Sequence, residues 1–222
     1  MKTKRKPIVI IPAYNEEKLI GRVLRRLKTQ AVEIVVVDDG SKDNTGKVAK
    51  EFGVTVLQHR INLGKGAAMK TGIEFAIRLK PDFVIFMDGD GQHDSKYIPE
   101  FCKKIEQGFD IVFGARKLSD KVPFVRFFGN RVGAFIINLL FHIYRSDLLC
   151  GYIALTPDAY KKIKWDSSRY GVETEIVART GKNKLKYEEV SMEAIYNDKY
   201  KGVTIMDAIG ILFNIPRWKF LN

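Results

Sequence analysis

Short, continuous apolar runs alternate with amphipathic stretches over the first half of this chain. The apolar runs are predicted as five strands, at residues 6–12, 33–37, 54–57, 83–87 and 110–114. The stretches between them carry apolar residues at helical spacing and are predicted as helices at 16–30, 45–52, 66–79 and 96–107. Continuous apolar strands are buried on both faces, and strands that alternate with helices form parallel sheets. The sequence therefore predicts an α/β fold, with a mostly parallel central sheet that helices cover on both faces.

Polar residues follow most of the predicted strands. They occur in Ala13-Tyr14-Asn15-Glu16 after the first strand, in Asp38-Asp39 after the second, at Asp88 and Asp90 after the fourth, and at Arg116 after the fifth. In open parallel sheets, ligands bind beyond the carboxyl ends of the strands. Acidic groups gathered at one edge repel each other unless a cation or hydrogen-bond donors lie between them. We therefore expect a ligand site at this edge.

The turn Asp88-Gly89-Asp90 has two interpretations of equal weight when it is taken alone. It directly follows an apolar run, and its glycine lets the backbone turn sharply near a ligand. Carboxylate oxygens suit Mg²⁺ or Mn²⁺, so the first interpretation is a metal site. The second is an acidic turn that caps the next helix, with Asp94 or Ser95 as the N-cap.

Charge and cysteine content limit the possible partners. The net charge of +12 indicates anionic partners, such as phosphates, nucleic acid or an acidic membrane surface. Lys and Arg are scattered without an interleaved aromatic platform, which argues against nucleic acid. Two cysteines form neither a disulfide framework nor a zinc site, so we expect a reducing cytosol. There is no apolar signal segment and no run of about 20 apolar residues, so we expect no spanning helix.

Several segments occur in order at spacings that match a known family. They are Ile-Pro-Ala-Tyr-Asn-Glu-Glu at 11–17, Val-Asp-Asp-Gly-Ser-Lys-Asp at 37–43, Asn-Leu-Gly-Lys-Gly at 62–66 and Asp-Gly-Asp at 88–90. Together they resemble the family 2 glycosyltransferases, which have a GT-A fold. Phe-Gly-Ala-Arg at 113–116, Gly-Asn-Arg at 129–131 and Ser-Asp-Leu-Leu-Cys-Gly-Tyr at 146–152 resemble the dolichyl- or polyprenyl-phosphate mannosyl- and glucosyltransferase branch.

The resemblance implies an inverting transfer of a hexose from a nucleotide diphosphate sugar, of the GDP-mannose or UDP-glucose type, to a lipid phosphate. It implies a nucleotide site made of Pro12, Ala13, Tyr14, Glu16, Asp38, Asp39, Asp88 and Gly89. It also implies that Asp88, Asp90 and Gln92 hold Mg²⁺ or Mn²⁺ on the donor diphosphate, where the ion neutralises charge on the leaving group. Gly64-Lys65-Gly66 lacks the Walker spacing and is interpreted as a tight turn that directs Lys65 toward the donor pyrophosphate.

The acceptor determines which further residues are needed. A sugar hydroxyl needs a general base, whereas a phosphomonoester has a second pKa near ~6 and arrives already nucleophilic. A phosphate acceptor therefore needs cations for positioning, and we predict Arg116 and Arg131 in this role, beside Asp90, as the catalytic residues. His93 is interpreted either as a base or as a supporting or exposed residue. Glu173 or Glu175 is expected to touch the sugar.

Two later segments are predicted as membrane-facing helices. Residues 127–144 are apolar around most of the helix, with a polar stripe of Arg131, Asn138, His142 and Arg145. This helix is either buried under the sheet or interfacial, and the resemblance favours the interfacial interpretation, with Arg131 turned toward the site. Residues 203–222 repeat the pattern and end in Arg217-Trp218-Lys219-Phe220, which is typical of a headgroup-level anchor.

We therefore expect a GT-A catalytic domain at 1–200, which includes an interfacial helix at about 125–145, and a membrane-associating segment at 201–222. The protein is expected to bind the cytoplasmic face of the membrane peripherally. One alternative is a glycosyltransferase that acts on a saccharide or protein hydroxyl. Another is a non-catalytic membrane-surface module that binds nucleotide sugars.

Overall fold

The structure is a computed structural model that describes residues 7–117, 124–169, 171–193, 195 and 205–220. A seven-stranded sheet forms its centre, with the strand order β3-β2-β1-β4-β6-β5-β7. The strands are β1 (Ile8–Ala13), β2 (Glu33–Asp38), β3 (Thr55–Gln58), β4 (Val84–Phe86), β5 (Ile111–Lys117), β6 (Ile153–Leu155) and β7 (Tyr187–Glu193). The helices are α1 (Glu17–Leu27), α2 (Thr45–Glu51), α3 (Lys65–Arg78), α4 (Ile98–Glu106), α5 (Phe124–Phe141), α6 (Pro157–Ile163), α7 (Val172–Lys182) and α8 (Ile205–Phe220).

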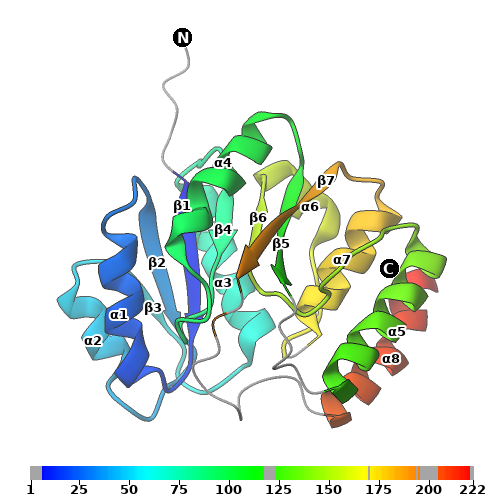
Figure 1. Ribbon diagram of the computed structural model, residues 1–222. Coiled ribbons are helices and arrows are strands. Elements are labelled where there is room, and N and C mark those ends of the chain that lie inside the picture. Colours follow the sequence, from blue (N-terminus) through cyan, green and yellow to red (C-terminus); the bar gives the residue numbers. More distant parts are fainter. Residues whose placement is uncertain (1–6, 118–123, 170, 194, 196–204, 221–222) are drawn as a thin grey trace.

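The predicted mostly parallel sheet is confirmed (Figure 1). β1 pairs in parallel with β2 and β4, β2 with β3, and β5 with β7. Only β6 among these strands runs antiparallel to its neighbours, β4 and β5. β5 is longer than predicted because it pairs with β7 along its whole length, as far as Lys117 and Glu193. Arg116 therefore lies inside β5 and does not follow it.

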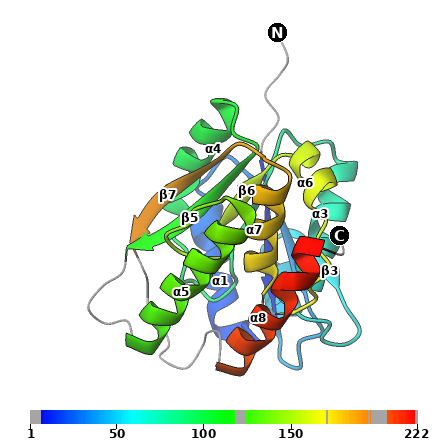
Figure 2. The ribbon, with the colours of Figure 1, turned by 90° about the vertical axis from the view of Figure 1, so that its right-hand side faces the viewer.

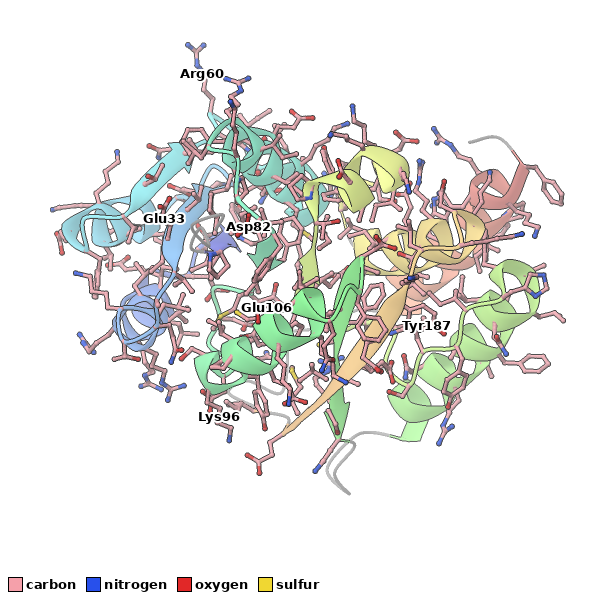
Figure 3. The ribbon with its side chains drawn as sticks, turned by 90° about the horizontal axis from the view of Figure 1, so that it is seen from above. Glu33, Arg60, Asp82, Lys96, Glu106 and Tyr187 are labelled. Carbon is pink, nitrogen blue, oxygen red and sulfur yellow. The ribbon has the colours of Figure 1, made fainter. Side chains whose placement is uncertain are left out.

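Helices cover both faces of the sheet, as predicted. On one face, apolar residues of α1, α2 and α4 pack on the strands, among them Ile20, Leu24, Ala49 and Phe101. On the other face, α3, α6 and α7 contribute Met69, Ile73, Tyr160 and Ile176. Figure 3 looks onto the amino ends of the strands, where Glu33 begins β2 and Asp82 precedes β4. The polar strand ends described above lie at the opposite, carboxyl edge.

α5 and α8 lie beside each other on the outer side of α7 (Figure 2). Ala134, Ile137 and Phe141 of α5 are buried against the core, and so are Ile215 and Trp218 of α8. The prediction of Trp218 as a headgroup-level anchor is therefore wrong, because its side chain is only 3% exposed. Lys182 of α7 donates hydrogen bonds to the carbonyls of Trp218 and Lys219, which holds the end of α8 in place.

The predicted polar stripe on the helix at 127–144 is also wrong in part. α5 ends at Phe141, and His142 has a φ of +55°, a left-handed conformation that terminates the helix. Arg145 is therefore outside the helix, and its side chain is only 1% exposed. The described side chains of α5 combine a face that is buried against the core with a face that leaves Phe135 and Leu139 exposed. Burial is therefore confirmed for one face, and the interfacial interpretation stays a prediction for the other.

None of the helices in the described part of the chain is long and apolar enough to cross a membrane. The expected boundary between a catalytic domain and a C-terminal segment, at 200 and 201, lies outside the described residues.

Candidate active site

The loops after β1 and β2 are joined to each other by hydrogen bonds. The Asn15 N–H donates to Ser41 Oγ at 3.0 Å, and Asn15 Oδ1 accepts from the Lys42 N–H at 2.8 Å. The Glu16 N–H donates to Thr45 Oγ1 at 2.7 Å. These bonds place Tyr14, which is 39% exposed, and Glu16 beside the end of β2. Pro12 and Ala13 are the last residues of β1 and belong to the same edge.

Asp38 and Asp39, at the end of β2, are both buried and occupied by protein donors. Asp38 accepts from the Ser41 N–H and from the Gln58 side-chain amide. Asp39 accepts from the N–H groups of Leu63 and Gly64, and its Oδ1 lies 2.7 Å from His59 Nδ1. Asp39 therefore holds residues 59–64 beside β2. This arrangement delivers the Gly64-Lys65-Gly66 turn to the carboxyl edge.

The glycines of the turn at 64–66 serve packing. A Cβ at Gly66 would lie 2.0 Å from the Ser167 carbonyl oxygen, and one at Gly64 would lie 2.5 Å from that of Ser168. Trp165 Nε1 donates to the Gly66 carbonyl at 3.0 Å. The chain at 165–168 therefore lies directly on the turn, and α3 begins with Lys65 at the site.

Lys65 forms two short ion pairs at the centre of the site. Its Nζ lies 2.6 Å from Asp88 Oδ1 and 2.7 Å from Glu173 Oε1, at the start of α7. Burial alone would lower the pKa of Lys65, but the two carboxylates outweigh burial and raise it. For Asp88, burial acts to raise the pKa, and the charge of Lys65 outweighs it, so the pKa is lowered. Lys65 is thus a cation and Asp88 an anion at neutral pH.

Asp90 has a different electrostatic environment from Asp88. Burial, reinforced by the charge of Asp88, raises the pKa of Asp90 to about 6. Its Oδ1 accepts from the Gln92 N–H at 2.9 Å. Gly89, between the two acids, is packed against Ala13 at the end of β1. A second carboxylate whose ionisation is opposed by the first is the arrangement that a divalent cation would stabilise.

The residues of the Asp88–Gln92 turn fit a divalent ion that prefers oxygen ligands. Among the described residues, no three His, Cys, Asp or Glu side chains are grouped to hold a metal by themselves. Asp88, Asp90 and the Gln92 amide would thus supply only part of a coordination shell. Mg²⁺ commonly binds in this way, through one or two carboxylates, substrate phosphates and water.

His93 lies beneath the acidic turn and is 3% exposed. Its Nδ1 accepts from the Asp88 N–H at 3.1 Å, and its ring stacks on Tyr152 with the centroids 5.0 Å apart. Burial lowers the pKa of His93 to about 4, so the ring is neutral at neutral pH. Because Nδ1 is occupied by a backbone donor, the proton resides on Nε2. Of the two interpretations of His93, the structure favours the supporting role over the base.

Arg116 is held by Asp147, a residue to which the sequence assigned no role. Arg116 Nε donates to Asp147 Oδ2 at 2.7 Å, and Nη2 donates to Oδ1 at 3.1 Å. Burial acts to raise the pKa of Asp147, but the hydrogen bonds and charge of Arg116 outweigh it and lower the pKa. Arg145 joins β5 to this segment, because its Nη2 donates to the carbonyls of Gly114 and Asp147. A bidentate pair with a buried carboxylate orders the guanidinium at the end of β5.

Arg131 lies on the exposed part of α5, one residue after a link between that helix and the site. Asn130 Nδ2 donates to the Ser146 carbonyl, and its Oδ1 accepts from the Leu148 N–H. These bonds tie α5 to the segment that contains Asp147. The structure thus connects α5 with the Arg116 side of the site, while Arg131 itself is exposed.

The two acidic residues at the start of α7 have separate roles. Glu173 reaches Lys65, as described above. Glu175 is fully buried and accepts hydrogen bonds from the Asp166 N–H, the Ser167 N–H and Arg179 Nε. Glu175 therefore anchors the chain at 166–167, and the expectation that it touches the sugar is not supported by its contacts.

Residues 8–163 match the family described as glycosyl transferase family 2, which is most of the chain. The chain is a family 2 glycosyltransferase. One relative, the UDP-N-acetylglucosamine–dolichyl-phosphate N-acetylglucosaminyltransferase of Methanococcus voltae, is 32% identical over 93% of this chain and 93% of its own. Another, the undecaprenyl-phosphate mannosyltransferase of Micrococcus luteus, is 26% identical over 95% of this chain and 93% of its own.

The solved structures of similar fold include a glucosyl-3-phosphoglycerate synthase of Mycobacterium tuberculosis in complex with Mn²⁺, uridine diphosphate and phosphoglyceric acid. It is 18% identical, the match covers 96% of this chain and 77% of that one, and the TM-score is 0.73. The GT-A type of fold predicted for this glycosyltransferase is confirmed, and so is its resemblance to the dolichyl- and polyprenyl-phosphate branch.

Sequence reasoning missed Asp147 and Gly151 as parts of the site. A Cβ at Gly151 would lie 2.5 Å from Lys65 Nζ and 3.0 Å from Asp88 Oδ2. Both residues lie in the segment 146–152, whose resemblance to the family was the only available signal. Their positions depend on β6, which brings residues 146–152 back between β4 and β5.

Proposed function

We propose that this glycosyltransferase moves a hexose from a nucleotide diphosphate sugar to a dolichyl or polyprenyl phosphate, with inversion and with the help of Mg²⁺ or Mn²⁺. The proposal rests on two features that lie at the same edge of the sheet. One is the acidic turn Asp88-Gly89-Asp90, and the other is Arg116, whose guanidinium is ordered by the buried carboxylate of Asp147. The names of relatives at 32% and 26% identity support the lipid phosphate as acceptor. These two relatives use different sugars, so the donor is left open between the UDP and GDP types.

On the donor side, the nucleotide would lie over the ends of β1 and β2, near Tyr14 and Asp38. Asp88, Asp90 and Gln92 would hold the divalent ion, which when bound neutralises the charge that develops on the leaving diphosphate. Lys65 adds a cation at the same place. The Mn²⁺ and uridine diphosphate present in a solved protein of similar fold support this assignment.

On the acceptor side, Arg116 would bind and orient the lipid phosphate. A phosphomonoester is largely ionised at neutral pH, so one of its oxygens can attack the anomeric carbon without a base. That attack breaks the bond between the sugar and the donor diphosphate and inverts the anomeric carbon. The neutral, backbone-bonded His93 agrees with a reaction that needs no histidine base.

The outer faces of α5 and α8 would touch the membrane in which the acceptor resides. Phe135 and Leu139 of α5 are 67% and 65% exposed, and Phe213 and Phe220 of α8 are 80% and 79% exposed. Apolar side chains on helices that also carry arginine and lysine are typical of interfacial helices. The proposal includes a peripheral position on the cytoplasmic face, because both described cysteines are free thiols.

The test is a donor panel with one acceptor. The protein is incubated with polyprenyl phosphate in detergent, Mn²⁺, and radiolabelled GDP-mannose, UDP-glucose or UDP-N-acetylglucosamine. We expect one donor to give label that extracts into chloroform–methanol, and EDTA to abolish it. The proposal would be refuted if none of the three donors gave label in the chloroform–methanol extract.

The raised pKa of Asp90 favours a second candidate, in which Asp90 serves as base for a saccharide hydroxyl. Oligosaccharide acceptors in parallel incubations test this candidate. Labelled oligosaccharide without labelled lipid would favour it over the lipid phosphate.

A further inference from the structure

The ammonium group of Lys65 lies against the carboxylate of Asp88, one of the residues that would hold the divalent ion. It binds Asp88 Oδ1 at 2.6 Å, and the backbone of Gly151 approaches both atoms closely. The other carboxylate oxygen, Asp88 Oδ2, lies 3.8 Å from His93 Nε2. Each of the two oxygens of Asp88 therefore has a nitrogen of the protein beside it, while 24% of the side chain is exposed.

We propose that Lys65 takes the place of the divalent ion in the substrate-free protein, and that the ion enters together with the nucleotide diphosphate. Lys65 would then leave Asp88 and bind the diphosphate. This inference rests on the proposed function of the site, since it concerns how the site binds metal and donor.

Electrostatic repulsion explains why a metal ion alone would bind poorly. A divalent cation at Asp88 would lie close to an ammonium group that two carboxylates hold at 2.6 and 2.7 Å. Two cations at such a separation in a half-buried site repel strongly. The ion can bind Asp88 only if Lys65 moves away from it. Lys65 moves away readily only if another anion is there to bind it.

The donor diphosphate supplies this anion and brings the ion with it. A lysine is a common ligand of phosphate groups, and phosphates also complete the shell of Mg²⁺ or Mn²⁺. Glu173 remains near Lys65 at the start of α7, so the lysine keeps one partner during the exchange. The metal and the nucleotide should therefore bind with strong mutual dependence, and each should bind weakly alone.

The test measures Mn²⁺ binding without any turnover. The electron paramagnetic resonance signal of unbound Mn²⁺ is titrated with wild-type protein, Lys65→Met and Lys65→Arg, first without nucleotide and then with UDP or GDP. We expect Lys65→Met to bind Mn²⁺ alone at least about tenfold more tightly than wild type, a change of about 1.4 kcal/mol. In the presence of nucleotide, Lys65→Met should bind Mn²⁺ more weakly than wild type.

Lys65→Arg separates charge from shape, because it retains the cation and should keep the weak binding of Mn²⁺ alone. Lys47→Met, on the exposed face of α2, is the control for loss of a positive charge elsewhere. If Lys65→Met fails to fold because two carboxylates lose their partner, the double variant Lys65→Met/Glu173→Gln removes one of them. The double variant should also bind Mn²⁺ alone more tightly than wild type.

Equal or weaker binding of Mn²⁺ alone by both folded Lys65→Met and the double variant would overturn the inference. So would tight binding of Mn²⁺ alone by the wild type. Because these titrations need no acceptor, an absence of sugar transfer would refute the proposed function and leave the exchange at Lys65 standing. Transfer together with unchanged Mn²⁺ binding in Lys65→Met would refute only the exchange.

Discussion

Burial and the charge of Asp88 oppose the ionisation of Asp90. Its pKa is raised from 3.8 to about 6, so the folded state binds more protons than the unfolded state between those pH values. The contribution of Asp90 to stability is thus fully present below about pH 4 and is lost as the pH rises to 6. We expect metal-free Asp90→Asn to be more stable than wild type at pH 7.5, by about 1–2 kcal/mol, and equal to it near pH 4.

Urea unfolding at the two pH values, in EDTA, measures this difference. The same variant should lose both sugar transfer and the stabilisation that Mn²⁺ with nucleotide gives to the wild type. Asp90→Asn that is less stable than wild type at pH 7.5 would show that the pKa of Asp90 is not raised.

Arg116 depends on its planar geometry, because two of its nitrogens bind the two oxygens of Asp147. Arg116→Lys keeps the charge beside this buried carboxylate and loses the bidentate pair. We expect the KM for polyprenyl phosphate to rise about tenfold, the loss of roughly one good hydrogen bond to a charged group. The affinity for nucleotide with Mn²⁺ should stay unchanged. Arg78→Lys, on the last turn of α3, is the control. If Arg116→Lys lost as much affinity for the donor as for polyprenyl phosphate, Arg116 would belong to the donor side.

At the scale of elements, the start of α3 is positioned by its close contact with the chain at 165–168. A methyl group at Gly66 would lie 2.0 Å from a backbone oxygen, and backbone cannot give way as a flexible side chain can. We expect Gly66→Ala to lower the free energy of unfolding by about 1–3 kcal/mol. Gly210→Ala in α8 is the matched control, since no described atom beyond its own stretch of the helix lies within 4 Å of its Cβ position, and it should be neutral or stabilising. Equal stability of Gly66→Ala and wild type in chemical denaturation would contradict this contact.

α5 presents its exposed apolar side chains away from α7, which gives a direct test of membrane contact. We expect the double variant Phe135→Asp/Leu139→Asp to lose most binding to vesicles that contain anionic lipid. Each apolar side chain withdrawn from the lipid removes about 1.5–3 kcal/mol of binding free energy. Leu79→Asp, which changes a leucine that is 48% exposed at the end of α3, is the control in the same co-sedimentation assay. Undiminished binding of the double variant would exclude α5 as the contact.

For the molecule as a whole, the sequence predicts the parts of the fold that local pattern determines. The strands β1, β2 and β4 are continuous apolar runs, and each ends within one residue of its predicted end, so their acidic ends could be placed at one edge. The reversed direction of β6 and the pairing of β5 with β7 join residues that are distant in the chain, and no local pattern encodes them. Asp147 and Gly151 depend on this topology and were therefore missed. Arg145 was misplaced because the apolar pattern runs past the point where His142 ends α5.

The central claim is that the acceptor is the phosphate group of a polyprenyl lipid. One measurement tests it most directly: initial rates with the preferred labelled donor and Mn²⁺, with polyprenyl phosphate in one series and the corresponding polyprenol, which lacks the phosphate, in the other. We predict labelled lipid with polyprenyl phosphate and none above background with polyprenol, because only the phosphate is a nucleophile without a base and only it can bind Arg116. Equal rates with the two lipids would contradict the claim.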